Sequence, residues 1–147
     1  MIKPITQDDI IELSKLYSSV FSEPPWNEVC ETSWTQERLE IIFNSPNFEG
    51  FLYEENGKSI GAVFGRGNSF KGNKELEIVE LFVSSDKQSK GIGSKLIEEV
   101  ENSIKSRGYK GTVLLTARCA PAYKFYCNKG YKSAEDMRVF KTLYREF

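Results

Sequence analysis

Histidine is absent from this sequence of 147 residues. That absence removes the commonest general base, the Ser-His and Cys-His nucleophile pairs, and the usual metal ligand. Any proton transfer must therefore use Glu, Asp, Tyr, Cys, Lys or water. The three cysteines, Cys30, Cys119 and Cys127, form no CxxC pair, so we expect reduced thiols and neither a disulfide framework nor a metal site.

An excess of charge of one sign and long hydrophobic runs are also missing. The formal net charge is -1, so we expect neither nucleic acid nor an anionic membrane as a partner. No segment approaches the ~20 apolar residues that a membrane span requires, and the sequence starts without a signal-peptide-like run. We therefore expect a cytoplasmic protein with a single domain over residues 1–147.

Apolar residues follow helix-like and strand-like spacings in turn along the chain. Strand-like patterns occur at residues 2–5, 48–53, 59–65, 76–83, 112–116 and 139–144. Helical patterns occur at residues 10–20, from a cap at 33–36 to before Pro46, at 92–105 and at 122–129. Thr6 to Asp9 forms a capping box before the first helix, and Asn56-Gly57 predicts a hairpin turn. The order β-α-α-β-β-β-α-β-α-β predicts a mixed α/β fold, with helices covering a largely antiparallel sheet that has at least one parallel crossover.

The segment from Leu81 to Lys95 carries the most information about chemistry. A helix start normally favours Asp or Glu, yet this one opens with lysines and two glycines, Gly91 and Gly93, and has no acid before Glu98. A phosphate or diphosphate would supply the missing negative charge, because glycines let it approach the unpaired amides. The alternative is that the two glycines only allow the helix to pack closely on a strand.

The familiar phosphate motifs do not fit this segment. A Walker loop, GxxxxGK[ST], occurs nowhere, and a dinucleotide fingerprint would need glycine where Leu96 stands. The segment instead resembles the pyrophosphate loop Q/R-x-x-G-x-G/A of the GNAT N-acetyltransferase superfamily, matched by Gln88-Ser89-Lys90-Gly91-Ile92-Gly93. The second signature of that superfamily, A-x-x-x-Y-x-x-x-G-F/Y, is matched by Ala122 to Tyr131.

The resemblance implies an N-acetyltransferase that uses acetyl-CoA as co-substrate, without a metal, and acetylates a primary amine of a small molecule or peptide by direct transfer. Backbone groups of the strand end would hold the pantetheine arm and the acetyl carbonyl, and loop amides would hold the pyrophosphate. By this resemblance the coenzyme-binding residues are Leu81, Phe82, Val83, Gln88, Ser89, Lys90, Gly91, Ile92, Gly93, Ser94, Cys119, Ala122, Tyr123 and Tyr126.

Three residues are catalytic candidates by the same resemblance. Tyr126 matches a tyrosine that can protonate the leaving thiolate, although it could instead pack one face of a short helix. Glu77 or Glu80, or water, would take the proton from the amine, and each glutamate could instead be a solvated or salt-bridged carboxylate. In a regular strand these two side chains face opposite sides, unless a bulge intervenes, and family members carry one there.

Three further residues bear on the expected coenzyme and acceptor contacts. Cys119 stands where many members have an asparagine, which weakens one polar contact and leaves an acyl-cysteine route open. Trp26 and Glu28 lie where the superfamily builds its acceptor wall, and could receive a cationic amine or form an exposed loop pinned by Trp26. Lys71 and Lys74 fit a solvated turn.

Two rival functions stay open from the sequence. The first is a non-catalytic acyl-CoA sensor or regulatory subunit with the same fold, and the second is a protein that binds another phosphate ligand at the same helix start. The identity of the amine and the oligomeric state are not specified, although an exposed last strand could pair two copies into a homodimer.

Overall fold

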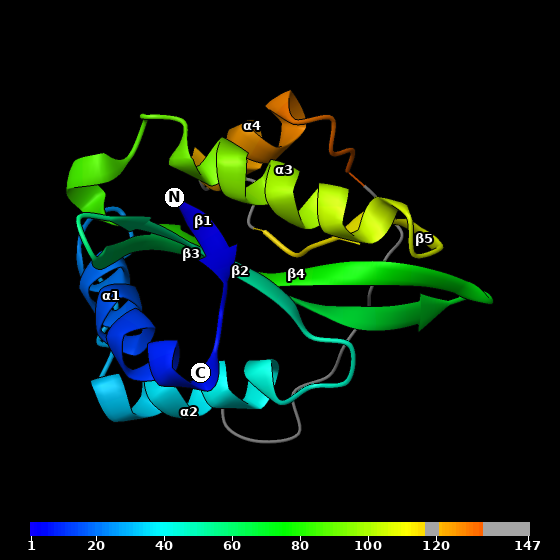
Figure 1. Ribbon diagram of the computed structural model, residues 1–147. Coiled ribbons are helices and arrows are strands. Elements are labelled where there is room, and N and C mark those ends of the chain that lie inside the picture. Colours follow the sequence, from blue (N-terminus) through cyan, green and yellow to red (C-terminus); the bar gives the residue numbers. More distant parts are fainter. Residues whose placement is uncertain (117–120, 134–147) are drawn as a thin grey trace, which may run out of the picture. The chain divides into compact units, whose positions relative to one another are not determined.

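The computed structural model describes residues 1–116 and 121–133, in two compact parts that divide between Leu115 and Thr116. Among the described residues, the first part holds five strands and three α-helices, and the second holds one helix (Figure 1). The elements are β1 (Ile2–Pro4), α1 (Ile10–Ser22), α2 (Thr32–Phe43), β2 (Glu49–Glu55), β3 (Lys58–Phe70), β4 (Asn73–Val83), α3 (Ile92–Lys105), β5 (Tyr109–Val113) and α4 (Pro121–Asn128), with short 3-10 turns at Gln7–Asp9 and Ser85–Lys87. The predicted strand at 139–144 and Cys119 lie outside the described residues.

The five strands form one sheet in the order β1-β2-β3-β4-β5. The first four pair antiparallel, and β5 pairs parallel to β4 after the α3 crossover. This arrangement confirms the predicted mixed α/β fold with a largely antiparallel sheet.

Two tight hairpins shape the long central strands. Asn56 and Gly57 both adopt left-handed conformations, with φ of 53° and 74°, as the predicted two-residue turn requires. Lys71 and Gly72 do the same, with φ of 51° and 78°. Because this second turn takes only two residues, β3 and β4 extend beyond the predicted limits of 59–65 and 76–83 to meet at Phe70 and Asn73.

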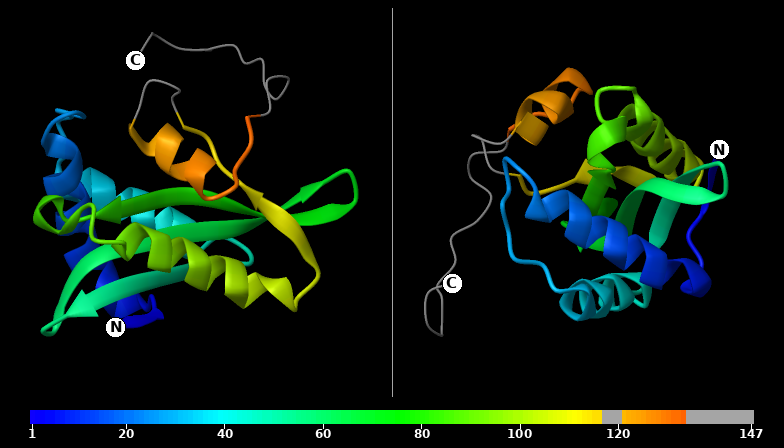
Figure 2. Two further views of the ribbon diagram at one scale, coloured as in Figure 1. Left: turned by 90° about the horizontal axis from the view of Figure 1, so that it is seen from above. Right: turned by 90° about the vertical axis from the view of Figure 1, so that its left-hand side faces the viewer.

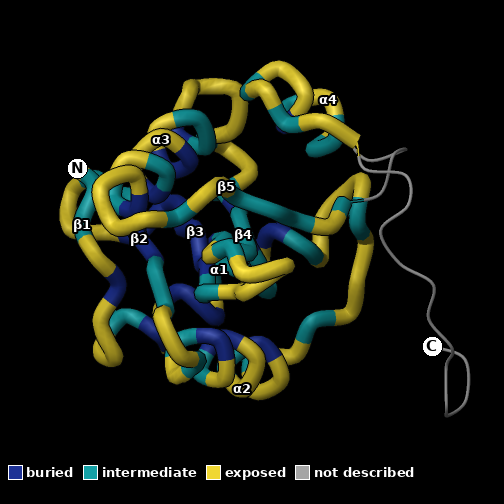
Figure 3. The backbone as a smooth tube through the Cα atoms, turned by 90° about the vertical axis from the view of Figure 1, so that its right-hand side faces the viewer, coloured by how far each residue is buried: buried dark blue, intermediate teal, exposed yellow. Residues whose placement is uncertain are grey.

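Helices cover both faces of the sheet. Figures 1 and 2 show α3 on one side and α1 and α2 on the other. Buried residues concentrate where these helices meet the strands, as the dark blue segments of Figure 3 indicate. The core between α1, α2 and the sheet includes Leu13, Leu39, Leu52, Phe64 and Phe82. Among the described helices, none combines the length and apolarity needed to cross a membrane.

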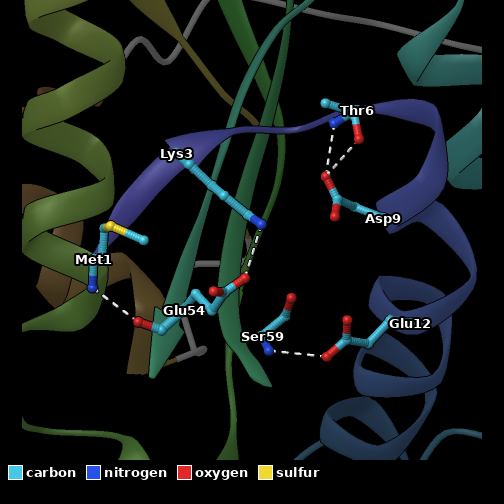
Figure 4. A network of polar contacts seen from close by, with 7 residues as sticks. All are labelled: Met1, Lys3, Thr6, Asp9, Glu12, Glu54 and Ser59. Atoms are coloured by element: carbon cyan, nitrogen blue, oxygen red, sulfur yellow. Dashed lines mark hydrogen bonds and ion pairs between the residues drawn. The ribbon is translucent and has the colours of Figure 1, made fainter. Parts of the chain in front are cut away.

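Polar contacts fix the N-terminal strand and the start of α1 (Figure 4). The backbone N–H of Thr6 donates to Asp9 Oδ2 at 2.8 Å, which confirms the predicted capping box. Glu12 Oε1 on α1 accepts from the N–H of Ser59 at 2.9 Å, and Lys3 pairs with Glu54 at 2.8 Å. These contacts tie β1 and α1 to the β2–β3 hairpin.

The predicted starts of α2 and β5 were also wrong. Helix α2 begins at Thr32 after the extended residue Glu31, so its cap precedes the predicted cap at 33–36. Strand β5 spans Tyr109–Val113 instead of 112–116, because the left-handed Gly108 turns the chain directly into pairing with β4. None of the β5 residues is fully buried.

Candidate active site

Helix α3 begins with backbone N–H groups that make no bond inside the helix. Its first intrahelical hydrogen bond runs from the N–H of Lys95 to the carbonyl of Gly91, at 3.1 Å, so the amides of residues 92–94 lack intrahelical acceptors. No side chain of the described residues caps this end, and its first turn contains no acid. The positive end of the helix dipole is therefore uncompensated, which suits an anion.

Gly91 is required by its backbone conformation. Its φ is 82°, a left-handed value that favours glycine, and a Cβ at this position would meet nothing within 4 Å. The alternative that Gly91 exists for close helix–strand packing is therefore wrong. Gly61 serves that purpose, because its Cβ would lie 3.3 Å from Ile92 Cγ2. The helix start thus sits directly on β3.

The loop between β4 and α3 is held by side chains at its base. Gln88 Nε2 donates to the carbonyl of Val83 at 3.0 Å, and Ser84 Oγ donates to Asp86 Oδ1 at 2.6 Å. That second bond holds the pKa of Asp86 below its usual range. Lys87 is paired with Glu55 at 2.9 Å. Gln88, the first residue of the loop motif, therefore joins the loop to the end of the strand.

The last residues of β4 have an open edge on the β5 side. Parallel pairing ends at Glu77 with Val113, while β4 continues to Val83. The N–H of Ser84 donates to the carbonyl of Ile60 at 2.8 Å. Because the backbone groups of successive strand residues point to opposite edges, those of Leu81 and Val83 point away from β3. The bond from Gln88 to the Val83 carbonyl agrees with this direction. Within the described residues, the N–H groups of Leu81 and Val83 thus point to the side on which no strand pairs with this stretch.

A β-bulge brings the two candidate glutamates to one face of the sheet. Phe64 pairs with Glu80 and Gly65 with Ile78, so Val79 is the extra residue. Glu77 pairs with Arg66, which lies two residues from Phe64 and so shares its face. The bulge that Glu77 and Glu80 need in order to share a face is therefore present. It turns both carboxylates toward α1 and α2.

Glu80 lies at the centre of a polar cluster joining three elements. Its Oε1 accepts from Arg38 Nε at 2.6 Å and from the hydroxyl of Tyr17 at 3.2 Å, and the side chain is only 10% exposed. Burial raises the pKa of Glu80 above its ordinary value, and the hydrogen bonds from Arg38 and Tyr17 oppose that rise. Burial and the charge of Glu80 hold the pKa of Tyr17 well above its usual range, so Tyr17 stays a donor. Both contacts use Oε1, which leaves Oε2 for another partner.

Glu77 lines a cavity of about 460 Å³ between α2 and the sheet. Its Oε2 lies 3.3 Å from Arg66 Nε, in an ion pair that is partly exposed. Arg38 lines the same cavity, so the guanidinium that holds Glu80 also faces this space. The cavity volume falls in the range of small-molecule sites.

Trp26 and Glu28 occupy the segment between α1 and α2. The Trp26 ring packs on Phe21 at 5.4 Å between centroids, and Phe21 packs on Tyr17 at 4.5 Å, so an aromatic row leads toward Glu80. Glu28 is exposed, and its charge contributes to raising the pKa of Glu80. Cys30 Sγ lies 3.9 Å from Glu28, and burial together with that carboxylate raises the pKa of the thiol. A substrate-binding role for Trp26 and Glu28 stays a prediction.

Helix α4, in the second part of the chain, carries Tyr126. The Tyr126 ring is buried between Phe125 at 5.2 Å and Tyr131 at 5.5 Å, both in edge-on geometry. Gly130, with φ of 92°, ends the helix as predicted. The hydroxyl groups of Tyr123 and Ser133 form a hydrogen bond at 3.1 Å. The role of Tyr126 as an acid stays a prediction, as do the coenzyme contacts of Ala122 and Tyr123.

A family model for the acetyltransferase (GNAT) domain matches residues 13–144. The chain belongs to the GNAT acetyltransferase family. Members of this family use acetyl-CoA as co-substrate. The match confirms the resemblance on which the sequence interpretation depends.

Individual relatives agree with this family. An uncharacterized N-acetyltransferase of Methanocaldococcus jannaschii is 25% identical over 138 residues, which cover 91% of this chain and 61% of that protein. The chain thus spans about 61% of the length of this curated relative. A possible acetyltransferase from Clostridium difficile 630 has a TM-score of 0.81 at 15% identity and covers 98% of both chains. An aminoglycoside acetyltransferase from an uncultured soil metagenomic sample, in complex with sisomicin, has a TM-score of 0.72 at 19% identity and covers 99% of this chain and 96% of that chain.

Three polar residues of the site were missed from the sequence. The sequence did not identify Arg38 or Arg66 as site residues, because a lone arginine on a helix or a strand usually lies on a solvated face. Tyr17 falls within the helical apolar pattern at residues 10–20, which by itself assigns no partner to its hydroxyl. A tyrosine in such a stripe needs a polar partner for its hydroxyl, and that requirement pointed to a group like Glu80.

Proposed function

We propose that this protein is an acetyl-CoA-dependent N-acyltransferase that transfers the acetyl group directly to a primary amine of a small molecule or peptide. The observation that carries this proposal is the bulge at Val79. It turns Glu77 and Glu80 to one face of β4, immediately before the stretch that has no strand partner on its β5 side among the described residues. A base and a row of free amides are thus adjacent on one strand.

The described residues fit coenzyme A on structural grounds. The diphosphate would meet the unpaired amides at the start of α3, where the first turn contains no acid to repel it. The pantetheine amides would pair with the backbone of Leu81 and Val83 as an additional strand does. When bound, the coenzyme supplies an activated acetyl thioester.

The chain's own residues would then orient the reaction and move protons. An N–H of the open β4 edge polarises the thioester carbonyl, and Glu80 Oε2 accepts a proton from the amine so that its lone pair can form the new C–N bond. The raised pKa of Glu80 suits this role, because it brings the carboxylate closer to the basicity that proton abstraction needs. Tyr126 gives a proton to the sulfur as the C–S bond breaks. Glu77, which is paired with Arg66, would bind the acceptor.

Amine acceptors are supported by the names of two relatives. The archaeal relative is named an N-acetyltransferase, and the metagenomic neighbour is an aminoglycoside acetyltransferase. Neither name identifies the acceptor of this chain.

The test is to incubate the protein with acetyl-CoA and a panel of amines while following the release of free thiol. We expect release with at least one amine and a loss of about 100-fold or more in Glu80→Gln, as removal of a general base gives. Coenzyme A binding by calorimetry is measured in parallel for both proteins. Binding without release from any amine would favour the non-catalytic sensor and reject this proposal.

A further inference from the structure

The cavity beside Glu77 combines balanced charge with an exposed apolar rim. Its charged lining consists of two glutamates and two arginines, Glu37, Glu77, Arg38 and Arg66. Seven large hydrophobic side chains of the described residues are exposed, and three of them, Trp34, Ile41 and Leu115, line this one cavity. Apolar side chains that gather at one hollow indicate a ligand site.

The apolar rim is built by two segments. Trp34 and Ile41 lie seven residues apart on α2, which places them on the same face of the helix, and their exposed fractions are 57% and 60%. Leu115, 69% exposed, follows β5. An apolar or aromatic group bound here would cover all three.

The ion pair between Arg66 and Glu77 places one cation beside one anion at the cavity wall. Their contact joins Arg66 Nε to Glu77 Oε2 at 3.3 Å, and the side chains are 37% and 25% exposed. Arg38 likewise contacts Glu80 through Nε. Both contacts run through Nε, and an arginine can bind a further carboxylate end-on through its two Nη atoms.

We propose that this cavity selects, as the acceptor, an α-amino acid with a large apolar side chain. Its ammonium group would lie at Glu77 and its carboxylate at Arg66, because an α-amino acid carries the two charges as close together as this ion pair does. Its side chain would cover Trp34, Ile41 and Leu115. The inference rests on the proposed function and adds the class of amine.

Polyamines and aminoglycosides fit this lining poorly. They carry several ammonium groups, which need an excess of carboxylates, whereas here each glutamate of the wall is matched by an arginine. An arginine beside a polycation repels it. A simple amine without a carboxylate leaves Arg66 without a new partner.

The experiment compares L-phenylalanine with phenethylamine, which keeps the ring and the amine but lacks the carboxylate. Spermidine and the aminoglycoside sisomicin serve as polycationic acceptors. We expect kcat/KM for phenylalanine to exceed that for phenethylamine by about tenfold or more, and both polycations to rank below it. In Arg66→Gln the ratio of phenylalanine to phenethylamine falls about tenfold, and Arg66→Lys restores part of it.

Arg107→Gln is the matched control. Arg107 forms a comparable, partly exposed ion pair with Glu49 but does not line the cavity, so the ratio should stay unchanged. A ratio near one in the wild type, release with other amines only, or equal loss in both variants would overturn this inference and leave the proposed function standing. No release with any amine would overturn both.

Discussion

At the scale of single residues, burial and a neighbouring cation act on the pKa of Glu80 in opposite directions. Burial favours the protonated carboxyl, and the guanidinium of Arg38 at 2.6 Å favours the carboxylate. Because Arg38 and Tyr17 come from different helices, the acid–base behaviour of Glu80 depends on how α1 and α2 pack on the sheet. A solvent-exposed carboxylate on β4 would lack this control.

Replacing Arg38 with glutamine should move the acidic limb of the pH profile to higher pH. A base must be deprotonated, so kcat/KM falls as the pH drops through the pKa of Glu80, and removing the cation that lowers this pKa raises it further. The measurement is kcat/KM against pH for wild type and Arg38→Gln. Glu80→Gln, as control, should lack this limb. A limb that stays in place or moves to lower pH would contradict the assignment of Glu80 as base.

Gly91→Asp should weaken coenzyme A binding by about tenfold or more. The new carboxylate would repel the diphosphate and accept a hydrogen bond from an amide at the start of α3. Gly91→Asn is the control, because asparagine has the same shape, tolerates φ of 82° and carries no charge. Calorimetric titration of both variants separates charge from backbone strain. Equal affinities in the two variants would rule out the diphosphate at this helix start.

Tyr126→Phe should lower kcat by about 10–100-fold while the KM for acetyl-CoA changes little. Phenylalanine keeps the ring that packs between Phe125 and Tyr131, so the helix itself should persist. Steady-state kinetics and the circular dichroism spectrum of the variant provide the check. An unchanged kcat would remove Tyr126 from the set of catalytic candidates.

At the scale of elements, β4 performs two tasks along its length. Its first half forms the hairpin with β3 and the parallel pair with β5, and within the described residues its last residues have no strand partner on the β5 side. The bulge at Val79 separates these halves and twists the strand, as bulges do. The pairing of β4 with β5 therefore ends next to the bulge that gives the two glutamates a common orientation.

The β3–β4 turn offers a test of the hairpin assignment. Lys71 occupies a left-handed position, φ 51°, that asparagine accepts at lower cost, so Lys71→Asn should raise the free energy of unfolding by about 1 kcal/mol. The reciprocal change Asn56→Lys, at φ 53° in the other hairpin, should lower it by a similar amount. Urea denaturation measures both. Destabilisation by Lys71→Asn would show that this turn has another conformation.

At the scale of the whole molecule, the sheet divides the proposed site between its faces within residues 1–115. The start of α3 lies against one face, where it packs on Gly61, and the glutamate cluster lies on the face covered by α1 and α2. The open edge of β4 is shared by both. Such a division would let a thioester and an amine approach the same edge from opposite sides.

Acetyl-CoA should therefore stabilise the folded protein as a whole. At a free concentration of 100 times its Kd, mass action raises the free energy of unfolding by about 2.7 kcal/mol. Adenosine diphosphate at the same concentration should stabilise less, since it has no pantetheine to pair with the β4 edge. Thermal unfolding with each ligand measures the difference. Equal stabilisation would favour a protein that binds other phosphate ligands.

The sequence alone determined the order of elements through α4, the Asn56-Gly57 turn, the capping box at Thr6 and the glycine-rich, acid-free start of α3. These depend on local spacing and backbone preference, which neighbouring residues set. Only the tertiary structure decided that Tyr17 and Arg38 meet Glu80, and that Arg66 and Trp34 share a cavity with Glu77. Those contacts join residues far apart in the chain, so their geometry exists only once the helices have packed on the sheet.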